Sequence, residues 1–285
     1  MPLSNREAFY KAKKLLQLNN SFHNDSEIYS LLIKANDFSS FTEIIVNFEK
    51  NLAKPQYFYR KLKKLISGIP LYYVLEEAPF LGENLFVNES VLIPRPETEE
   101  LCIKCEKLIK DMKFSPTNIA EICTGSGCIA TYFKKKFRES NVYAIDKYTD
   151  ALEVCRKNAE ILQTDLIILR GDKTEPLLKR NLKIDLLISN PPYVENINDI
   201  EENVKKYEPM HAIYSKDGTA FYEDYFKKAN DLMNKKFIMA FEINFDQEEK
   251  LTFLINKYFN LNNISFKFEK DQFGLTRFLF IFGGL

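Results

Sequence analysis

Strand-like and helix-like segments alternate along the chain from residue 118 onward, and this alternation limits the fold more than any other feature of the sequence. Helices that separate successive strands act as right-handed crossovers, which give a mostly parallel sheet with helices on both faces. The expected helices span about 127–138, 149–162, 219–234 and 246–259. The expected strands span 118–123, 142–146, 166–170, 184–189, 236–243, 264–269 and 277–282.

The last two expected strands have no helix between them. The connection Gln272-Phe273-Gly274-Leu275 is too short for a crossover, so these strands should form an antiparallel hairpin. Seven strands that end in such a hairpin are typical of the class I (Rossmann-like) methyltransferase folds. We therefore predict an α/β fold of this class, although a fold does not by itself determine the chemistry.

The first part of the chain has a different pattern. Up to about residue 67, apolar residues recur at steps of three and four, which predicts a small bundle of about four helices. Gly68-Ile69-Pro70 ends this region, and a hairpin with its turn near Gly82-Glu83-Asn84 should follow, before a helix that begins at Pro96. We predict an N-terminal helical bundle at 1–75, a hairpin linker at 76–95 and a catalytic domain at 96–285.

Charge and composition exclude several classes of protein. The chain has 40 Lys and Arg against 40 Asp and Glu, and a balanced charge argues against a protein that coats nucleic acid. Residues 1–75 hold 11 basic and 6 acidic side chains, a net charge of +5, which leaves −5 for the remainder and is compatible with a bundle that binds a protein substrate. Because neither a signal peptide nor a long apolar segment is visible, we expect a cytoplasmic protein that has no membrane contact. We also expect a monomer.

Cysteine and histidine usage points away from metal chemistry. Five scattered Cys residues suit reduced thiols, and Cys102 and Cys105 lie on a predicted helix without a second Cys pair. With only two His residues, neither a His-rich metal site nor a Ser-His-Asp triad is expected. We therefore expect no bound metal.

A glycine-containing loop follows the first strand of the alternating region. The segment Cys123-Thr124-Gly125-Ser126-Gly127 connects this strand to a helix, and glycines there allow a ligand to approach the backbone closely. Asp146 ends the next strand, where a carboxylate can accept hydrogen bonds from both ribose hydroxyls. Together the loop and the acid favour a nucleoside ligand. Asp172 ends the third strand and is either a hydrogen-bond acceptor for an adenine amino group or a solvated loop residue.

The most informative segment is Asn190-Pro191-Pro192-Tyr193, which follows a buried strand at the sheet edge where open α/β folds bind ligands. Prolines lack an N–H and stiffen the backbone, so the segment is rich in acceptors. A planar NH₂ group could donate to the Asn190 side-chain oxygen and the Pro191 carbonyl while Tyr193 stacks on its face. Such a nitrogen could attack the sulfonium methyl group of S-adenosyl-L-methionine.

With these residues the chain resembles the protein-(glutamine-N5) methyltransferases of peptide-chain release factors. The resemblance covers roughly residues 68–285 and rests on many blocks in order. These blocks are Gly68-Ile69-Pro70-Leu71-Tyr72-Tyr73-Val74, Pro79-Phe80-Leu81-Gly82, Val91-Leu92-Ile93-Pro94-Arg95-Pro96-Glu97-Thr98-Glu99, the glycine loop, Asn190-Pro191-Pro192-Tyr193, Tyr207-Glu208-Pro209, Asp217-Gly218 with Phe221-Tyr222, and Asp271 with Gly274 and Arg277.

The resemblance implies methylation of the glutamine in the Gly-Gly-Gln motif of class I release factors, with S-adenosyl-L-methionine as donor. It implies catalytic roles for Asn190, Pro191 and Tyr193, with Pro192 also at the substrate. The segment Arg95-Pro96-Glu97-Thr98 favours a release factor over a ribosomal-protein glutamine. The implied cofactor-binding residues are Cys123, Thr124, Gly125, Ser126, Gly127, Asp146, Asp172, Lys173 and Asn190.

Three positions depart from the family's pattern. Cys123 stands where the first loop Gly is usual, Asn244 where a Gly commonly follows Glu242-Ile243, and Lys173 where a large aromatic residue often follows Asp172. The Cys123 side chain fits only if it points into the core. These departures keep open a non-catalytic binding module with a decayed cofactor site. An amino-methyltransferase for adenine in nucleic acid is the other alternative, because the Asn-Pro-Pro-Tyr segment suits any planar NH₂ nucleophile.

Overall fold

A computed structural model describes residues 3–19 and 24–284 of the chain. The chain divides into two compact units, Met1–Glu76 and Glu77–Leu285. Each unit buries a hydrophobic core of its own. The division falls within one residue of the end predicted for the helical bundle.

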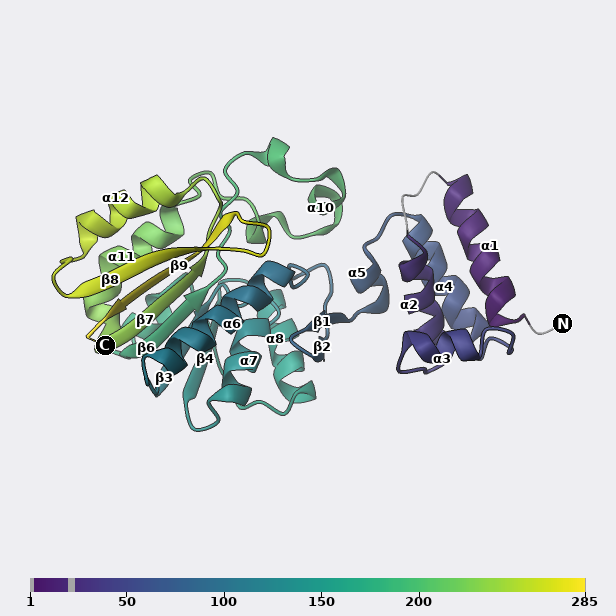
Figure 1. Ribbon diagram of the computed structural model, residues 1–285, viewed down its shortest axis with the longest axis horizontal. Helices are drawn as coiled ribbons and strands as arrows, with labels where there is room; N and C mark the ends of the chain where they lie inside the picture. Colours follow the sequence, from purple (N-terminus) through teal and green to yellow (C-terminus); the bar gives the residue numbers. More distant parts are fainter. Residues whose placement is uncertain (1–2, 20–23, 285) are drawn as a thin grey trace. The chain divides into compact units, whose positions relative to one another are not determined.

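The first unit is built from amphipathic helices around a small apolar core (Figure 1). Ser4 and Glu7 form a capping box at the start of its first helix, which satisfies backbone N–H groups that have no partner inside the helix. Pro55 occupies the first turn of its fourth helix, where the missing N–H costs nothing. The helices are α1 (Asn5–Leu18), α2 (Asp25–Ala35), α3 (Phe41–Val46), α4 (Pro55–Ile66) and α5 (Leu71–Leu75).

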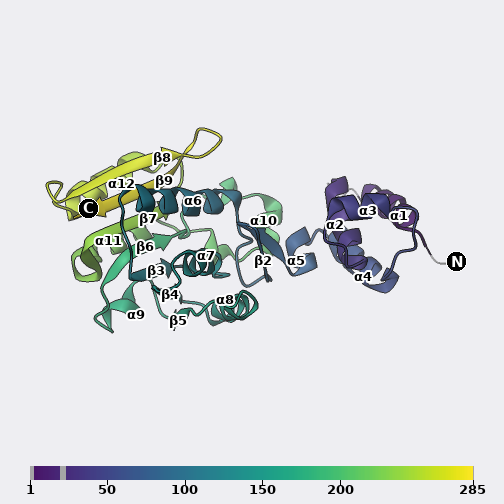
Figure 2. The ribbon, with the colours of Figure 1, turned by 60° about the horizontal axis from the view of Figure 1, so that its bottom comes forward.

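The second unit contains a seven-stranded sheet in the order β5-β4-β3-β6-β7-β9-β8. The first five of these strands are parallel to one another, whereas β9 pairs antiparallel with both β7 and β8. Figure 2 shows this antiparallel pair at one end of the sheet and β5 at the other. The strands are β3 (Asn118–Ile122), β4 (Asn141–Asp146), β5 (Ile167–Arg170), β6 (Ile184–Ser189), β7 (Met233–Glu242), β8 (Ile264–Lys270) and β9 (Thr276–Gly283). The α/β class, the seven strands and the terminal hairpin are thereby confirmed.

Helices cover both faces of the sheet because successive strand residues point to opposite sides. In β3, Ile119 packs into one core and Ala120 into the other. One face is covered by α6 (Pro96–Asp111), α7 (Cys128–Lys136) and α8 (Thr149–Ile161), and the other by α9 (Glu175–Leu178), α11 (Ala220–Leu232) and α12 (Glu248–Tyr258). The remaining short helices are η1 (Ile197–Asp199), α10 (Glu202–Tyr207) and η2 (Met210–Ala212).

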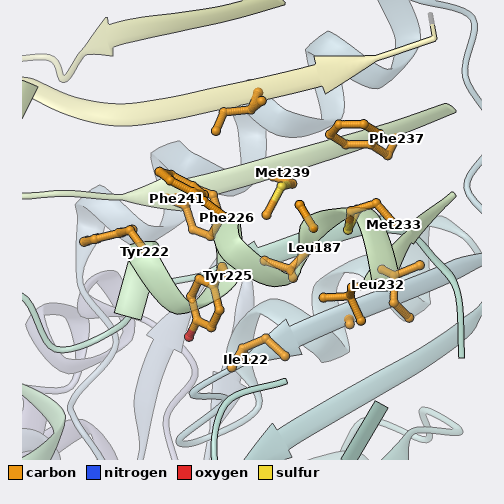
Figure 3. Close-up of a cluster of buried hydrophobic side chains, with 14 of the residues drawn as sticks. Ile122, Leu187, Tyr222, Tyr225, Phe226, Leu232, Met233, Phe237, Met239 and Phe241 are labelled. Carbon is orange, nitrogen blue, oxygen red and sulfur yellow. The ribbon is translucent and has the colours of Figure 1, made fainter. Parts of the chain in front are cut away.

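Aromatic side chains dominate the core beneath α11 (Figure 3). The rings of Tyr225 and Phe241 stack with their centroids 5.7 Å apart, and Tyr222 meets Phe241 edge to face. The buried Tyr222 hydroxyl donates to the Glu242 backbone carbonyl at 2.7 Å, so the end of β7 is tied to α11. This core holds the carboxyl ends of β6 and β7 in place.

The expected hairpin is present, but its turn lies earlier than predicted. Strands β1 (Ala78–Phe80) and β2 (Glu83–Leu85) are joined by Leu81 and Gly82, both with positive φ. Two such residues are what a tight two-residue hairpin turn requires. Glu83 and Asn84 therefore belong to a strand and not to the turn. In the described ranges, no helix combines the length and the apolar character needed to cross a bilayer.

Candidate active site

A cavity opens at the carboxyl edge of the parallel strands, where α/β sheets bind ligands. Its wall is formed by the residues that follow β3, β4, β5 and β6, together with a segment that leads into α6. The structure brings most of the sequence-predicted site residues together there. These are Cys123, Thr124, Gly125, Ser126, Asp146, Asp172, Lys173, Asn190 and Pro192. Gly127, Pro191 and Tyr193 lie outside the cavity wall.

The glycine loop and the acid of the next strand are coupled through the backbone. Gly125 has φ +51°, and its N–H donates to one Asp146 carboxylate oxygen at 3.0 Å. The other Asp146 oxygen accepts the Tyr148 backbone N–H at 3.1 Å. A Cβ atom added to Gly125 would meet no atom within 4 Å, so there is open space directly against the loop backbone. A bulky ligand can approach the main chain at this point.

Gly127 has a packing role instead. Its φ is +78°, and an added Cβ would lie 2.6 Å from the Cys155 sulfur atom in α8. Only a residue without a side chain lets α7 begin this close to α8. The expectation that Gly127 also contacts a cofactor stays a prediction.

Cys123 adopts the left-handed conformation that glycine favours, with φ +61°. Its sulfur lies 3.8 Å from the Tyr225 hydroxyl and packs against the aromatic core. The side chain thus points into the core, which is the orientation that the sequence analysis required, and burial raises the pKa of this thiol.

Lys173 lacks the aromatic ring expected after Asp172, but another residue supplies one. The Lys173 ammonium group lies 5.0 Å from the centroid of the Phe221 ring, and both residues line the cavity. Phe221 comes from the first turn of α11, about fifty positions later in the chain. Asp172 lies 3.8 Å from the Lys147 ammonium, so this carboxylate is partly paired at the cavity rim.

Two cavity residues without a sequence assignment face each other. The rings of Tyr148 and His211 lie with their centroids 3.7 Å apart, and both line the cavity. Burial lowers the pKa of His211. Tyr148 lies two positions after Asp146, so its place at the sheet edge could have been foreseen, whereas nothing in the sequence around His211 signals that η2 reaches the cavity.

Glu121 is a third residue that the sequence analysis left without a role. It lies on β3, lines the cavity and is 1% exposed. Its carboxylate accepts hydrogen bonds from the Thr124 hydroxyl at 2.5 Å and the Ala130 N–H at 2.8 Å. Burial raises the pKa of Glu121 to about 8, against the lowering effect of these hydrogen bonds. The sequence did hold one sign of this residue, because Glu121 is an acidic residue within the apolar run 119–122.

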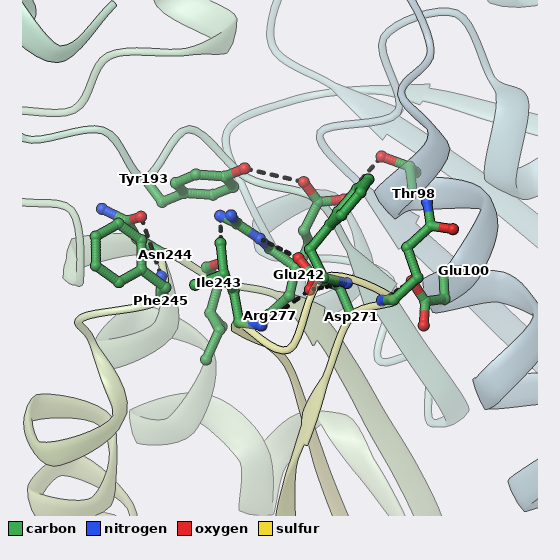
Figure 4. Close-up of polar contacts among 12 residues, drawn as sticks. Thr98, Glu100, Tyr193, Glu242, Ile243, Asn244, Phe245, Asp271 and Arg277 are labelled. Carbon is green, nitrogen blue, oxygen red and sulfur yellow. Dashed lines mark hydrogen bonds and ion pairs between the residues drawn. The ribbon is translucent and has the colours of Figure 1, made fainter.

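Asn190 is held by a chain of side chains from three elements. Its amide nitrogen donates to the Thr98 hydroxyl at 3.0 Å, and Thr98 in turn donates to Glu242 Oε2 at 2.7 Å. The Tyr193 hydroxyl donates to Glu242 Oε1 at 2.9 Å. Figure 4 shows Thr98 and Tyr193 at opposite sides of the Glu242 carboxylate. Glu242 is 2% exposed, and burial raises its pKa.

The segment leading into α6 is anchored by a second buried carboxylate. The Glu208 carboxylate accepts hydrogen bonds from the Arg95 guanidinium at 2.5 Å and from the Ile93 backbone N–H at 3.1 Å. Glu208 is 6% exposed. Arg95 also lines the cavity, and Glu208 lies two positions before η2, which carries His211. The contact therefore joins two cavity-forming segments that lie more than a hundred positions apart in the sequence.

The cysteines form no metal site. Cys102 and Cys105 are buried in α6, and burial raises the pKa of both thiols. Within 3–19 and 24–284, no three His, Cys, Asp or Glu residues come together in a group that could hold a metal ion.

Comparison with known proteins places this site in context. A family model described as the methyltransferase small domain matches residues 101–208. The release factor glutamine methyltransferase of Bacillus cereus is 33% identical over 89% of this chain and 90% of its own length. That of Flavobacterium psychrophilum is 37% identical over 74% of each chain. The crystal structure of SMU.776 in complex with SAH has the same fold, with a TM-score of 0.52 and 10% identity over 73% of this chain and 56% of that one.

The Bacillus cereus relative matches across both units of the chain, and the segment leading into α6, the glycine loop, Asn190 with Pro192, and Phe221 from the blocks that carry the resemblance line one cavity at the sheet edge. The chain therefore belongs to the family of release factor glutamine methyltransferases.

Proposed function

We propose that this protein transfers a methyl group from S-adenosyl-L-methionine to the side-chain nitrogen of the glutamine in the Gly-Gly-Gln motif of class I release factors. One observation carries the proposal. The acceptor-rich Asn190-Pro191-Pro192-Tyr193 segment follows β6, and its Asn190 and Pro192 line the same cavity as the glycine loop and Asp146. Family membership supports the release factor as substrate.

The residues of the cavity fit the proposed cofactor. The open space against Gly125 admits a ligand to the backbone, and the sulfur of Cys123 lies against the Tyr225 hydroxyl in the aromatic core. In this proposal Asp146 accepts hydrogen bonds from the ribose hydroxyls, and Asp172 accepts one from the adenine amino group. These features argue against a decayed binding site. When bound, the cofactor supplies a methyl group on a positively charged sulfur atom, which needs no metal for activation.

The protein's part of the reaction is to hold the glutamine amide. The Asn190 side-chain oxygen and the Pro191 carbonyl accept the two N–H groups of the amide, which fixes the direction in which its nitrogen faces the cofactor. Such positioning is worth up to about 7–11 kcal/mol of the barrier. The amide nitrogen keeps its proton until the methyl group has been transferred, so no side chain must act as a strong base first.

The test uses a methyl-labelled cofactor and two substrates, an intact class I release factor and its Gln→Ala variant in the Gly-Gly-Gln motif. We expect labelling of the intact factor alone. Equal labelling of both substrates would overturn the assignment of the glutamine. Nuclease treatment of the reaction adds a control, because an adenine amino-methyltransferase would lose its substrate whereas this enzyme keeps its own.

The N-terminal helical unit has a proposed role in binding the release factor. Residues 1–75 carry a net charge of +5, and Phe41, Ile45 and Val46 on α3 expose apolar surface. Such a combination suits a partner with an acidic and partly apolar surface. Replacing Phe41 and Val46 by Ser should raise the KM for the release factor without changing the affinity for the cofactor.

A further inference from the structure

We infer that Thr98 and Glu242 orient the side-chain amide of Asn190, so that its oxygen and not its nitrogen faces the substrate glutamine. The inference rests on the proposed function for the identity of the substrate. Thr98 and Glu242 are positioning residues in this scheme, since they act through Asn190. The Thr of the Arg95-Pro96-Glu97-Thr98 segment thereby acquires a physical role.

Hydrogen-bond accounting sets the orientation. A carboxylate only accepts, so Glu242 requires that the Thr98 hydroxyl donate its single proton to it at 2.7 Å. The Thr98 oxygen can then only accept from Asn190, which must present its NH₂ group at 3.0 Å. The Asn190 amide oxygen is consequently left on the other side, toward the cavity that this residue lines.

The opposite orientation would fail at the substrate. If the Asn190 NH₂ group faced the cavity, it would meet the NH₂ group of the glutamine, donor against donor. On the Thr98 side, the Asn190 oxygen would then face a hydroxyl that already donates its proton to Glu242, so no hydrogen bond could form between them. Both contacts would be lost together, so the network favours one orientation strongly.

Both oxygens of Glu242 accept hydrogen bonds. Its second oxygen accepts one from the Tyr193 hydroxyl at 2.9 Å, so two O–H groups converge on one carboxylate. Burial raises the pKa of Glu242, whereas the hydrogen bonds from Thr98 and Tyr193 and the positive charge of Arg277 on β9 act against that rise. Thr98 is 3% exposed and Glu242 is 2% exposed, so water does not compete for these hydrogen bonds.

The experiment compares Thr98→Val, which keeps the shape of the side chain but removes the hydroxyl, with Thr98→Ser, which keeps the hydroxyl. We expect Thr98→Val to lower kcat for release factor methylation by about 100-fold, the loss expected of a misplaced catalytic contact. The Ser variant should stay within about threefold of the wild type, because it restores the acceptor for Asn190. Calorimetry with S-adenosyl-L-methionine should show that both variants still bind the cofactor.

A readout that does not depend on activity separates this inference from the proposed function. In ligand-free protein, NMR should show contacts between the Asn190 side-chain NH₂ protons and the Thr98 methyl group, and slow exchange of those protons. In Thr98→Ser, which has no methyl group, the slow exchange should persist and the contact should move to the β protons of position 98, whereas in Thr98→Val the NH₂ protons should exchange rapidly. If the wild type shows these signals but does not methylate the release factor, the proposed function fails and the orientation stands.

Two results would overturn the inference. One is a wild-type protein in which the Asn190 NH₂ protons show no contact with Thr98. The other is a Thr98→Val variant with wild-type kcat, or a Thr98→Ser variant as impaired as Thr98→Val, because in either case the hydroxyl would not be what positions Asn190.

Discussion

The side-chain nitrogen of Asn190 lies 3.0 Å from the hydroxyl of Thr98, although 92 positions separate the two residues in the sequence. Asn190 follows β6, and Thr98 lies in the first turn of α6. The contact joins two blocks of sequence that have no visible relation along the linear chain. It also suggests how each part of the site can be tested separately.

Replacing Asn190 by Ala should abolish methyl transfer while the protein stays folded. Among the described contacts, the Asn190 side chain forms a hydrogen bond only with Thr98. Thr98 keeps its own hydrogen bond to Glu242 when Asn190 is replaced. Circular dichroism should therefore be unchanged, and activity should fall by at least about 100-fold. Wild-type activity in this variant would contradict the role assigned to Asn190.

Substitutions of Cys123 should separate backbone strain from side-chain packing. At φ +61°, Cys123→Val places a β-branched residue in the left-handed region, and we expect a loss of about 1–2 kcal/mol in the free energy of unfolding. Cys123→Gly relieves the strain but removes the contact with Tyr225, so its stability should stay within about 1 kcal/mol of the wild type. Urea denaturation measures both variants. A Val variant as stable as the Gly variant would show that the backbone here is not strained.

Glu121 should make stability depend on pH. Burial raises its pKa from 4.5 to about 8, with a further contribution from the nearby charge of Asp146. A raised folded-state pKa stabilises the protein fully below the unfolded-state pKa, and that stabilisation is lost as the pH rises from about 4.5 through about 8. Each pKa unit corresponds to about 1.4 kcal/mol.

Glu121→Gln should remove this dependence, because an amide does not titrate in that range. We therefore expect the free energy of unfolding of the variant, relative to the wild type, to increase as the pH rises across this interval. Parallel pH profiles for the two proteins would show that Glu121 does not titrate with a raised pKa.

Glu208 should be more sensitive to loss of its acceptor oxygens than to loss of its charge. Glu208→Ala leaves the Ile93 N–H and the Arg95 guanidinium without their partner, and we expect it to cost about 1–3 kcal/mol in the free energy of unfolding. Glu208→Gln keeps one acceptor and should cost less. Thermal denaturation of the two variants checks the order, which would be contradicted by equal losses.

The sheet could be predicted closely from the sequence, because its strands are short apolar runs separated by amphipathic helices. All seven expected strands occur within a few residues of their expected ends, and β6 occurs at 184–189 as predicted. The sequence analysis misplaced the hairpin turn at Gly82-Glu83-Asn84, because nothing in the residue type of Leu81 indicates that it adopts a positive φ. The small helices α10 and η2 were missed for the same reason, since segments this short are stabilised by tertiary contacts.

The sequence by itself determined which chemistry the chain carries, because the glycine loop, Asp146 and the Asn190-Pro191-Pro192-Tyr193 segment are local motifs whose backbone properties can be inferred from residue type. Only the tertiary structure decided which partners these motifs have. Folding places Thr98 between Asn190 and Glu242, turns the Cys123 sulfur toward Tyr225, and brings Phe221 to Lys173. The physical reason is that these contacts join residues far apart in the sequence. Their geometry depends on how the helices pack against the two faces of the sheet, which no local motif specifies.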